Sequence, residues 1–443
     1  MNSKSVTVIG GGLAGAEAAW QLARQGAAVT LYEMRPKLST GAHHTALLAE
    51  LVCSNSLRAA DLGNAVGLLK EELRQLDSLI MRAAAATEVP AGGATAVDRT
   101  EFAQFVTRAV ESHPLITVCR QEITELPKSG TVIVASGPLT SSALAEHLRQ
   151  ALEAPYLAFF DAAAPIVLAD SIDMSQAFMA SRYGKGEAAY INCPLNEEEY
   201  DRFYQALIAA ERQQLSDIDT TVCFEGCMPI ESMADRGRDT PLFGPLKPVG
   251  LTDPRTGKRP FAVLQLRQDN RGATMYNLVG FQTRLTWREQ KRVFSLIPAL
   301  RHAEYVRFGV MHRNTFIDSR SVLWPTLQWR KDARVFFAGQ VTGVEGYVES
   351  AATGLVAGIN AYRFAQGMEP LVLPVVTAHG ALINYITEHS PSPLQPMNVT
   401  FGLFPPLASP PRERRLRNLA YAERAMRELT EFFCKHSPNC LCG

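Results

Sequence analysis

Two of the eight cysteines lie four residues apart in the segment CFEGCMPIE, and a third, Cys53, lies in ELVCSNSLRA. Cysteine thiolates act as nucleophiles, redox partners or metal ligands, and buried thiols also fill protein cores. Gly226 precedes Cys227 and Pro229 follows it, which predicts an exposed bend. Three interpretations stay open: a Cys223–Cys227 redox pair, a Cys53–Cys227 pair of nucleophile and acid or base, or core thiols throughout.

A second chemical signal is the spacing G-x-G-x-x-G over residues 10–15. It follows a strand predicted over 6–9, and an Ala-rich helix over 16–25 leads to a second strand over 29–32 that ends at Glu33. The glycines permit a tight turn, close approach of the backbone to a pyrophosphate and close helix–strand packing. A carboxylate at the end of the second strand binds ribose hydroxyls and repels a 2′-phosphate. The stretch therefore predicts a site for FAD or NAD at a helix N-terminus.

Two later segments favour FAD. Residues 131–138 predict a buried strand that returns beneath the dinucleotide, and residues 335–361 predict a strand, a Gly-rich turn and a helix of small residues that closes over a flavin. No second G-x-G-x-x-G follows a strand, so no separate nicotinamide domain is predicted. The candidate FAD contacts are Gly10, Gly11, Gly12, Leu13, Ala14, Gly15, Glu33, Gly339, Gln340, Gly343 and Gly346.

These elements predict an α/β fold: a Rossmann-like, discontinuous FAD-binding domain of the glutathione-reductase-like flavoprotein type with an inserted α+β domain. The first part of the FAD-binding domain is expected over 1–158, the inserted substrate domain over 159–328, and the second part over 329–443. The insertion is placed where the strand–helix rhythm ends and where prolines, charges and aromatic residues increase. An Arg-rich amphipathic helix is expected after Pro410 and Pro411.

Basic residues are concentrated in the predicted insertion. Between 236 and 292, twelve Lys or Arg and four Asp or Glu give a local charge of +8, although the whole chain is neutral. Such a segment could bind RNA phosphates while Tyr276, Phe281 and Trp287 stack on bases, or it could be a solvated face. The candidate RNA-binding residues are Arg284, Trp287, Arg288 and Lys291.

The bulk composition excludes other classes. No apolar run reaches the length of about 18 residues that a membrane span needs, and the first residues enter a strand without room for a signal peptide. The cysteine spacing does not predict a disulfide framework. Cys434, Cys440 and Cys442 match no standard zinc site, so no metal is predicted. We expect a cytoplasmic protein.

Four further residues are candidates for supporting roles. His43 and His44 follow the second strand and would contact flavin or folate, or lie in a mobile loop. Arg58 and Lys70 follow Cys53 and would activate its thiol or guide a phosphate.

Longer sequence blocks carry a resemblance to a known family. GGGLAGAEAAWQLA, VTLYEMRP, ELVCSNSLR, FEGCMPIE, GPLKPVGL, YNLVGFQT, AEYVRFGVMHRNTFI and AGQVTGVEGYVES together resemble the bacterial folate- and FAD-dependent tRNA (uracil-54-C5)-methyltransferases. The resemblance covers nearly the whole chain. Related FAD enzymes that install carboxymethylaminomethyl groups on the wobble uridine share the flavin fingerprint, but they are longer and lack the FEGCMPIE block.

The resemblance implies methylation of uracil-54 C5 in the tRNA T-loop, with 5,10-methylenetetrahydrofolate as carbon donor, FAD as cofactor and NADPH or NADH as reductant. It assigns the functional cysteines to Cys53 and Cys227. Uracil C5 becomes nucleophilic once a thiolate adds to C6, so Cys227 is expected as the nucleophile and Cys53 as the general acid/base. Cys223 is then a packing residue, and no stable protein partner is expected. The alternative is an FAD-dependent thiol/disulfide oxidoreductase without an RNA substrate.

Overall fold

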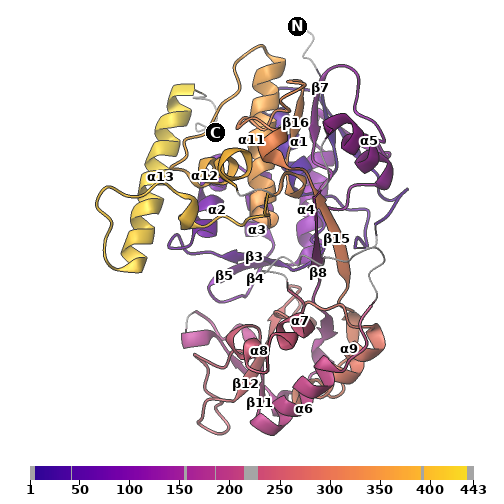
Figure 1. Cartoon of the computed structure of the whole chain (residues 1–443), viewed down its shortest axis with the longest axis vertical. Coiled ribbons are helices and arrows are strands. Elements are labelled where there is room, and N and C mark those ends of the chain that lie inside the picture. The colour runs from indigo at the N-terminus through magenta and orange to yellow at the C-terminus, as the bar shows by residue number, and fades with distance from the viewer. Residues whose placement is uncertain are drawn as a thin grey trace.

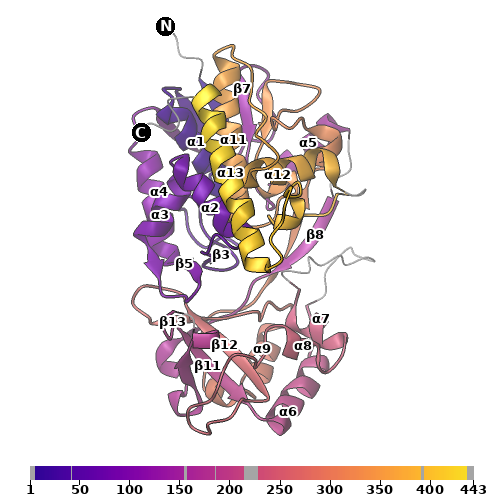
Figure 2. The ribbon, with the colours of Figure 1, turned by 90° about the vertical axis from the view of Figure 1, so that its left-hand side faces the viewer.

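The computed structural model describes residues 5–40, 42–153, 157–184, 186–213, 228–390 and 394–436. The chain forms a larger unit from its N-terminal and C-terminal parts and a smaller unit from its middle part (Figure 1). The first and the last described segments, β1 (Val6–Ile9) and α13 (Arg414–His436), both belong to the larger unit (Figures 1 and 2). None of the described helices is long and apolar enough to span a membrane.

A five-stranded parallel sheet with the order β16-β7-β1-β2-β6 lies at the centre of the larger unit. Val8 is paired with Leu31 on one side and Ile133 on the other, and all three side chains are buried. Parallel strands covered on both faces require such continuous apolar runs. The strands are β1 (Val6–Ile9), β2 (Val29–Glu33), β6 (Ile116–Arg120), β7 (Thr131–Val134) and β16 (Val335–Phe337).

Helices cover this sheet and bury its side chains in one apolar cluster. They are α1 (Leu13–Arg24), α2 (Ala65–Gln75), α3 (Leu79–Ala86), α4 (Arg99–Glu111), α5 (Ser142–Leu152), α10 (Ser319–Val322), α11 (Tyr347–Ala365), α12 (Ala378–Asn384) and α13 (Arg414–His436). The expected C-terminal amphipathic helix is confirmed as α13, which packs on α2 (Figure 2).

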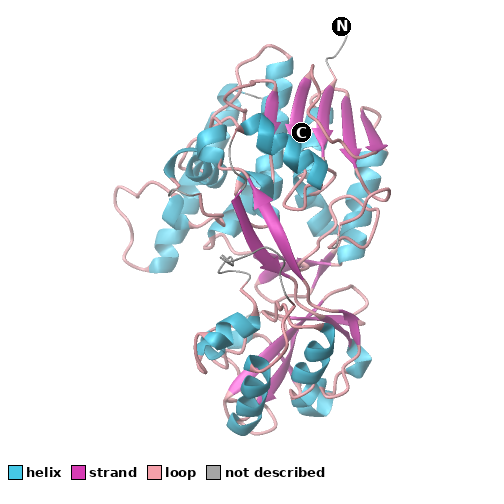
Figure 3. Ribbon diagram, turned by 45° about the vertical axis from the view of Figure 1, so that its right-hand side comes forward, coloured by secondary structure: helices cyan, strands magenta, loops and turns pink. Residues whose placement is uncertain are grey.

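Two small sheets lie between the sheet of the larger unit and the smaller unit. An antiparallel sheet has the order β3-β5-β4 and contains β3 (Ser56–Ala59), β4 (Glu88–Val89) and β5 (Ala94–Val97). The antiparallel pair β8 (Leu157–Ala162) and β15 (Met311–Phe316) connects the two units (Figure 3). The domain boundaries proposed at 158/159 and 328/329 lie near this pair and stay predictions.

The smaller unit is built on a six-stranded antiparallel sheet with the order β10-β11-β12-β13-β9-β14. Its strands are β9 (Ile166–Leu168), β10 (Phe178–Ala180), β11 (Tyr190–Leu195), β12 (Ala262–Gln268), β13 (Met275–Leu278) and β14 (Tyr305–Arg307). Its helices are α6 (Glu197–Ile208), α7 (Ile230–Asp235), α8 (Thr240–Phe243) and α9 (Trp287–Phe294). The α/β fold class with an α+β insertion is confirmed.

Two of the proposed base-stacking residues belong to the core of the smaller unit. Phe281 is fully buried between Phe203 and Phe294, and Tyr276 is also buried. The prediction that Phe281 and Tyr276 stack on RNA bases is therefore wrong, because packing on the antiparallel sheet removes both rings from solvent.

Helices α1 and α11 pack closely against each other in the larger unit. A Cβ at Gly354 would lie 2.3 Å from the carbonyl oxygen of Ala14, and a Cβ at Gly358 would lie 2.8 Å from that of Ala18. Small residues on both helices therefore allow backbone contact. Because α1 follows β1 and α11 follows β16, this contact fixes the C-terminal part of the chain onto the N-terminal part.

Gly354→Ala is expected to lower the free energy of unfolding by about 1–3 kcal/mol, because the new methyl group must displace α11 from α1. Urea-induced unfolding measures the change. Gly93→Ala is the control, since no atom lies within 4 Å of a Cβ at that position. Equal stability of the two variants would contradict the proposed contact.

Candidate functional site

A cavity with an empty volume of about 990 Å³, part of it open to solvent, lies at the carboxyl ends of β1, β2 and β7. Ligands of open parallel α/β sheets bind at this edge. The cavity walls combine the turn after β1, the loops after β2, β6 and β7, and the start of α11. They include residues 10–14, 33–35, 121–123 and 135–141, together with Gly339, Gln340, Tyr347 and Ser350.

The three motif glycines meet different constraints. Gly10 has a φ of +105°, and a Cβ there would lie 2.4 Å from the carbonyl oxygen of Ala135. A Cβ at Gly15 would lie 1.8 Å from the carbonyl oxygen of Gly10. A Cβ at Gly12 would meet no protein atom within 4 Å, so this glycine leaves open space at the cavity.

Gly12 is also the N-cap of α1, and no side chain caps the helix there. The first N–H groups of α1 have no partner within the helix, and the helix dipole favours an anion at this end. Open space and free donors together fit a pyrophosphate.

Glu33 binds the glycine turn and Arg35. Its carboxylate accepts hydrogen bonds from the Gly11 N–H (3.0 Å), the Arg35 N–H (3.0 Å) and the Arg35 guanidinium (2.9 and 3.1 Å). Burial acts to raise the pKa of Glu33, but the hydrogen bonds and charge of Arg35 outweigh it and lower the pKa. The sequence motif located Glu33 but not Arg35, two residues further along, which neutralises it.

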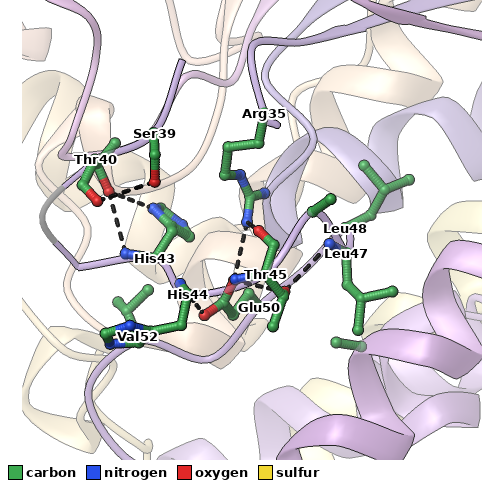
Figure 4. A network of polar contacts seen from close by, with 12 residues as sticks. Arg35, Ser39, Thr40, His43, His44, Thr45, Leu47, Leu48, Glu50 and Val52 are labelled. Atoms are coloured by element: carbon green, nitrogen blue, oxygen red, sulfur yellow. Dashed lines mark hydrogen bonds and ion pairs between the residues drawn. The ribbon is translucent and has the colours of Figure 1, made fainter. Parts of the chain in front are cut away.

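A polar network extends from Arg35 along the segment after β2 (Figure 4). Arg35 donates to Glu50 (3.1 Å), and Glu50 also accepts hydrogen bonds from the N–H groups of His44 (2.8 Å) and Thr45 (3.1 Å). His43 lines the cavity at the carboxyl ends of β1, β2 and β7, which we call the dinucleotide cavity. Burial lowers the pKa of His43 to about 4, and the charge of Arg35 adds to this effect. His43 is therefore neutral near pH 7.

This segment ends at Cys53, where two arginines bind the backbone. Arg99 of α4 donates to the carbonyl oxygens of Leu51 (2.8 Å) and Cys53 (3.4 Å). Arg307 of β14, in the smaller unit, donates to the carbonyl oxygen of Val52 (2.7 Å). Both units therefore hold the residues that precede the thiol.

A third arginine, Arg267 of β12, binds the residues that follow Cys53. It donates to Ser54 Oγ (2.7 Å) and Asn55 Oδ1 (2.9 Å). Burial lowers the pKa of Arg267, and the charge of Cys53 acts in the opposite direction. Arg99, Arg267 and Arg307 therefore bind the residues on both sides of the thiol, and Arg99 is itself paired with Asp269 (3.1 Å).

Tyr347, the first residue of α11, completes this support. Its hydroxyl oxygen accepts hydrogen bonds from the N–H groups of Cys53 (2.8 Å) and Ser54 (3.0 Å). Burial, followed by the charge of Cys53, raises the pKa of Tyr347, so the hydroxyl stays neutral. The sequence analysis missed Tyr347, although its position directly after the Gly-rich turn was a usable signal.

A second cavity, with an empty volume of about 810 Å³, lies where the two units meet. Residues of the larger unit, including His44, Leu51 and Arg99, face residues of the smaller unit, including Arg307. Glu50 lines both cavities. The segment that carries Cys53 therefore separates a dinucleotide-type site from a cleft between the units.

Arg58 and Lys70 support the strand after Cys53. Arg58 forms an ion pair with Glu349 of α11. The buried Lys70 ammonium donates to the carbonyl oxygens of Leu57 and Arg58 (both 3.2 Å). Burial lowers the pKa of Lys70 to about 8. These contacts hold β3 in place and, among the described residues, do not lead to the thiol.

The remaining predicted cofactor residues differ in their positions. Gly339 and Gln340 line the dinucleotide cavity, as do Leu13 and Ala14. Gly343 packs against Leu394, and Gly346 is the N-cap of α11. These last two glycines shape the turn rather than the cavity wall.

Several of the cysteines in question, including Cys223, Cys227, Cys440 and Cys442, lie outside the described residues. Cys193 is buried in β11, whereas Cys434 is exposed on α13. No group of three or more His, Cys, Asp or Glu side chains in the described parts of the chain could hold a metal ion.

The proposed RNA-binding residues lie at the start of α9 and before it. Trp287 is 58% exposed and stacks on Phe308, with ring centroids 5.4 Å apart at 15°. Phe308 stacks in turn on Tyr305 (5.1 Å, 12°), and the Lys291 ammonium lies 5.5 Å from the Phe308 ring. Arg288 is exposed. The exposed indole thus covers a rigid stack of rings.

The local charge of +8 overstates the basic character of the folded surface. Arg238 pairs with Glu197 and Asp201, which lie outside the counted segment. Arg271 likewise pairs with Glu101, at 3.1 Å. Arg284 is partly buried, 3.9 Å from Glu231. Acidic residues that are distant in sequence therefore neutralise much of the segment, and Arg288 and Lys291 remain exposed without such a partner among the described residues.

Known proteins resemble this chain over its whole length. The family model "Glucose inhibited division protein A" matches residues 5–369. The methylenetetrahydrofolate–tRNA-(uracil-5-)-methyltransferase TrmFO of Desulforamulus reducens is 61% identical over 435 residues, which cover 98% of this chain and 99% of that protein. The enzyme of the same name from Listeria innocua is 60% identical over 423 residues, or 96% and 97% of the two chains. The chain belongs to this methyltransferase family.

The family membership confirms the resemblance seen in the sequence blocks. A solved structure, that of Aquifex aeolicus GidA, has the same fold with a TM-score of 0.72 at 18% identity. The alignment covers 100% of this chain and 74% of that chain. A member of the TrmFO family therefore has the GidA fold in a shorter chain.

Tyr347→Phe is expected to lower kcat for tRNA uracil methylation about tenfold or more while leaving tRNA affinity unchanged. The substitution leaves two partly buried N–H groups without their acceptor, at a cost of up to about 1–3 kcal/mol each, and loosens Cys53. Single-turnover kinetics and filter binding measure the two quantities.

Tyr385→Phe is the matched control, because Tyr385 is also buried and donates to the carbonyl oxygen of Gln395 (3.1 Å) away from this site. If both variants lost activity equally, the effect would be general destabilisation rather than positioning of Cys53.

Proposed function

We propose that this protein methylates C5 of uracil-54 in the T-loop of tRNA to give 5-methyluridine. The carbon donor is 5,10-methylenetetrahydrofolate and the reductant is NADPH or NADH. The observation that carries the proposal is full-length identity of about 60% to relatives named as folate-dependent tRNA uracil-5 methyltransferases. The residues just before Cys53 line two cavities, Val52 the first and Leu51 the second, which supports it.

The large cavity fits FAD. Gly12 provides open space, the uncapped start of α1 provides N–H donors, and Gly339, which lies against Ala14, and Gln340 add to the wall. Arg35 and Glu33 hold the turn in shape without filling it. Bound FAD would supply the carrier for the one-carbon unit and for reducing equivalents between folate, NAD(P)H and uracil.

The cysteines supply the remaining chemistry. The Cys227 thiolate forms a bond to uracil C6, which moves electron density to O4 and makes C5 a carbon nucleophile. After C5 has gained its new carbon, its proton passes to Cys53, and the bond between C6 and the Cys227 sulfur then breaks. Arg99, Arg267 and Arg307 hold residues 51–55 by hydrogen bonds and so keep the Cys53 side chain in place to receive this proton.

The thiol/disulfide oxidoreductase alternative has weaker support. The similar full-length relatives are named as methyltransferases, and none of those reported above is named as a thiol/disulfide oxidoreductase. A cytoplasmic location without a stable protein partner remains a prediction.

Cys53→Ala and Cys227→Ala are each expected to abolish formation of 5-methyluridine, because each removes a group that must touch the uracil ring. Both variants should retain bound FAD. The assay combines enzyme, unmodified tRNA transcript, methylenetetrahydrofolate and NADPH, followed by nucleoside analysis, with flavin absorbance as the test of folding.

Cys223→Ala is the matched control for this pair and should keep nearly full activity. A redox pair between Cys223 and Cys227 predicts that both variants lose activity alike. Full activity in Cys53→Ala or Cys227→Ala would exclude the assignment.

We further propose that Arg284, Trp287, Arg288 and Lys291 contact the tRNA. Arg288 and Lys291 are exposed cations beside the Trp287 indole, and the Phe308 and Tyr305 rings hold that indole flat. An exposed, supported ring with neighbouring cations suits an unstacked base and its phosphate. Arg307 lies between Tyr305 and Phe308 in the sequence and binds Val52, next to Cys53.

Trp287→Ala is expected to weaken tRNA binding by about 1–3 kcal/mol, or roughly 5- to 150-fold, because base stacking is lost. Filter binding at fixed salt measures the affinity. Trp324→Ala is the control, since Trp324 is 47% exposed but stacks with Arg330 (4.0 Å) in the larger unit. Unchanged tRNA affinity in Trp287→Ala would rule out this surface.

A further inference from the structure

A third cavity, with an empty volume of about 990 Å³ and open to solvent, lies between α2 and α13. Its walls are the start of α2, residues 399–402 and the start of α13. Three arginines line it, Arg58, Arg414 and Arg417, together with polar residues such as Asn64 and Asn418. None of its lining residues is acidic.

Arg414 and Arg417 face a cavity without an acidic lining residue, and the nearest acid in the sequence is Glu413, just before Arg414. Neither guanidinium has a carboxylate partner among the described residues, and Arg414 is exposed. The charge of Arg58 is neutralised by an ion pair with Glu349, whose side chain is fully buried. The cavity wall therefore holds two arginines without an ion pair in the described parts of the chain, together with the Arg58–Glu349 ion pair.

The surrounding helices add positive potential. Asn64, the N-cap of α2, makes no capping hydrogen bond with its side chain, and the first turn of α2 contains no acid. The first turn of the 23-residue α13 also lacks an acid and begins with the sequence RRLR. Cations at helix N-termini are unfavourable, since both carry positive charge. A bound anion would relieve this conflict.

We propose that this cavity binds a phosphate group. Its two sources in the reaction are the tRNA backbone and the nicotinamide dinucleotide. That tRNA or the dinucleotide supplies the phosphate rests on the proposed function. That the cavity binds an anion rests on its arginines, its shape and the absence of a carboxylate from its lining. Guanidinium groups bind phosphate oxygens in pairs, which suits two arginines one turn apart on α13.

The cavity shares its structural elements with the Cys53 site. Arg58 lies on β3, five residues after Cys53 in the sequence. Its partner Glu349 lies on α11, two residues after Tyr347, which accepts hydrogen bonds from the N–H groups of Cys53 and Ser54. A phosphate held here would thus fix its molecule relative to Cys53.

The experiment compares the double variant Arg414→Gln/Arg417→Gln with Arg412→Gln/Arg415→Gln. The control removes the same charge from exposed neighbours that do not line the cavity. Both are prepared as holoenzyme, with flavin absorbance as the folding check. The probes are unmodified tRNA across a salt series, NADPH in flavin reduction without tRNA, and inorganic phosphate in thermal unfolding.

If the bound phosphate belongs to tRNA, Arg414→Gln/Arg417→Gln (the cavity variant) should bind tRNA about tenfold more weakly. The slope of log affinity against log salt concentration should also fall by about one for each lost phosphate contact. The control variant should show a much smaller change in both quantities. For a dinucleotide phosphate, the cavity variant should instead raise the KM for NADPH and leave tRNA binding unchanged. In either case inorganic phosphate should raise the Tm of the native protein and of the control more than that of the cavity variant.

Equal behaviour of the two double variants in all three measurements would overturn the proposal. Failure of the native protein to bind or methylate tRNA would overturn the proposed function instead. The phosphate-dependent Tm would still decide whether the cavity is an anion site.

Discussion

The site depends on three largely buried guanidinium groups that hold residues 51–55 by their carbonyl and polar side-chain oxygens. An arginine removed from water must replace its lost hydration with hydrogen bonds, and a backbone turn with free carbonyls provides them. Arg99 comes from the larger unit, whereas Arg267 and Arg307 come from the smaller one. The same hydrogen bonds therefore position Cys53 and fasten the two units together.

The flavin side of the site is built on close packing rather than on charge. Strand β16, which follows the smaller unit in the sequence, completes the parallel sheet, and α11 returns to lie on α1 through Gly354 and Gly358. The first residue of α11 is Tyr347, which holds Cys53. Helix α11 therefore supplies part of the cavity wall and also supports Cys53. Because α11 belongs to the C-terminal part of the chain, both parts of the chain must pack together before the cavity and the Cys53 site are complete.

Local rules are broken at the places where ligands are proposed. Gly12 leaves α1 without a side-chain cap, α13 begins with arginines at its positive end, and Trp287 exposes an indole to solvent. Each arrangement is unfavourable in an isolated chain, and each becomes favourable when an anion or a base is bound. The buried core, in contrast, follows the ordinary pattern of apolar strands and amphipathic helices.

The dinucleotide turn, its flanking strands and the late Gly-rich element were predictable from the sequence, because strand, turn and helix signals act over a few residues. The sequence blocks likewise identified the family. Tertiary structure alone decided that Arg35 neutralises Glu33, that Tyr347 binds the backbone at Cys53, and that distant acids cancel much of the basic segment. It also buried Phe281 and Tyr276 while leaving Trp287 exposed. Residue type and spacing specify what a side chain is able to do, but its partners and its burial depend on which distant elements pack against it.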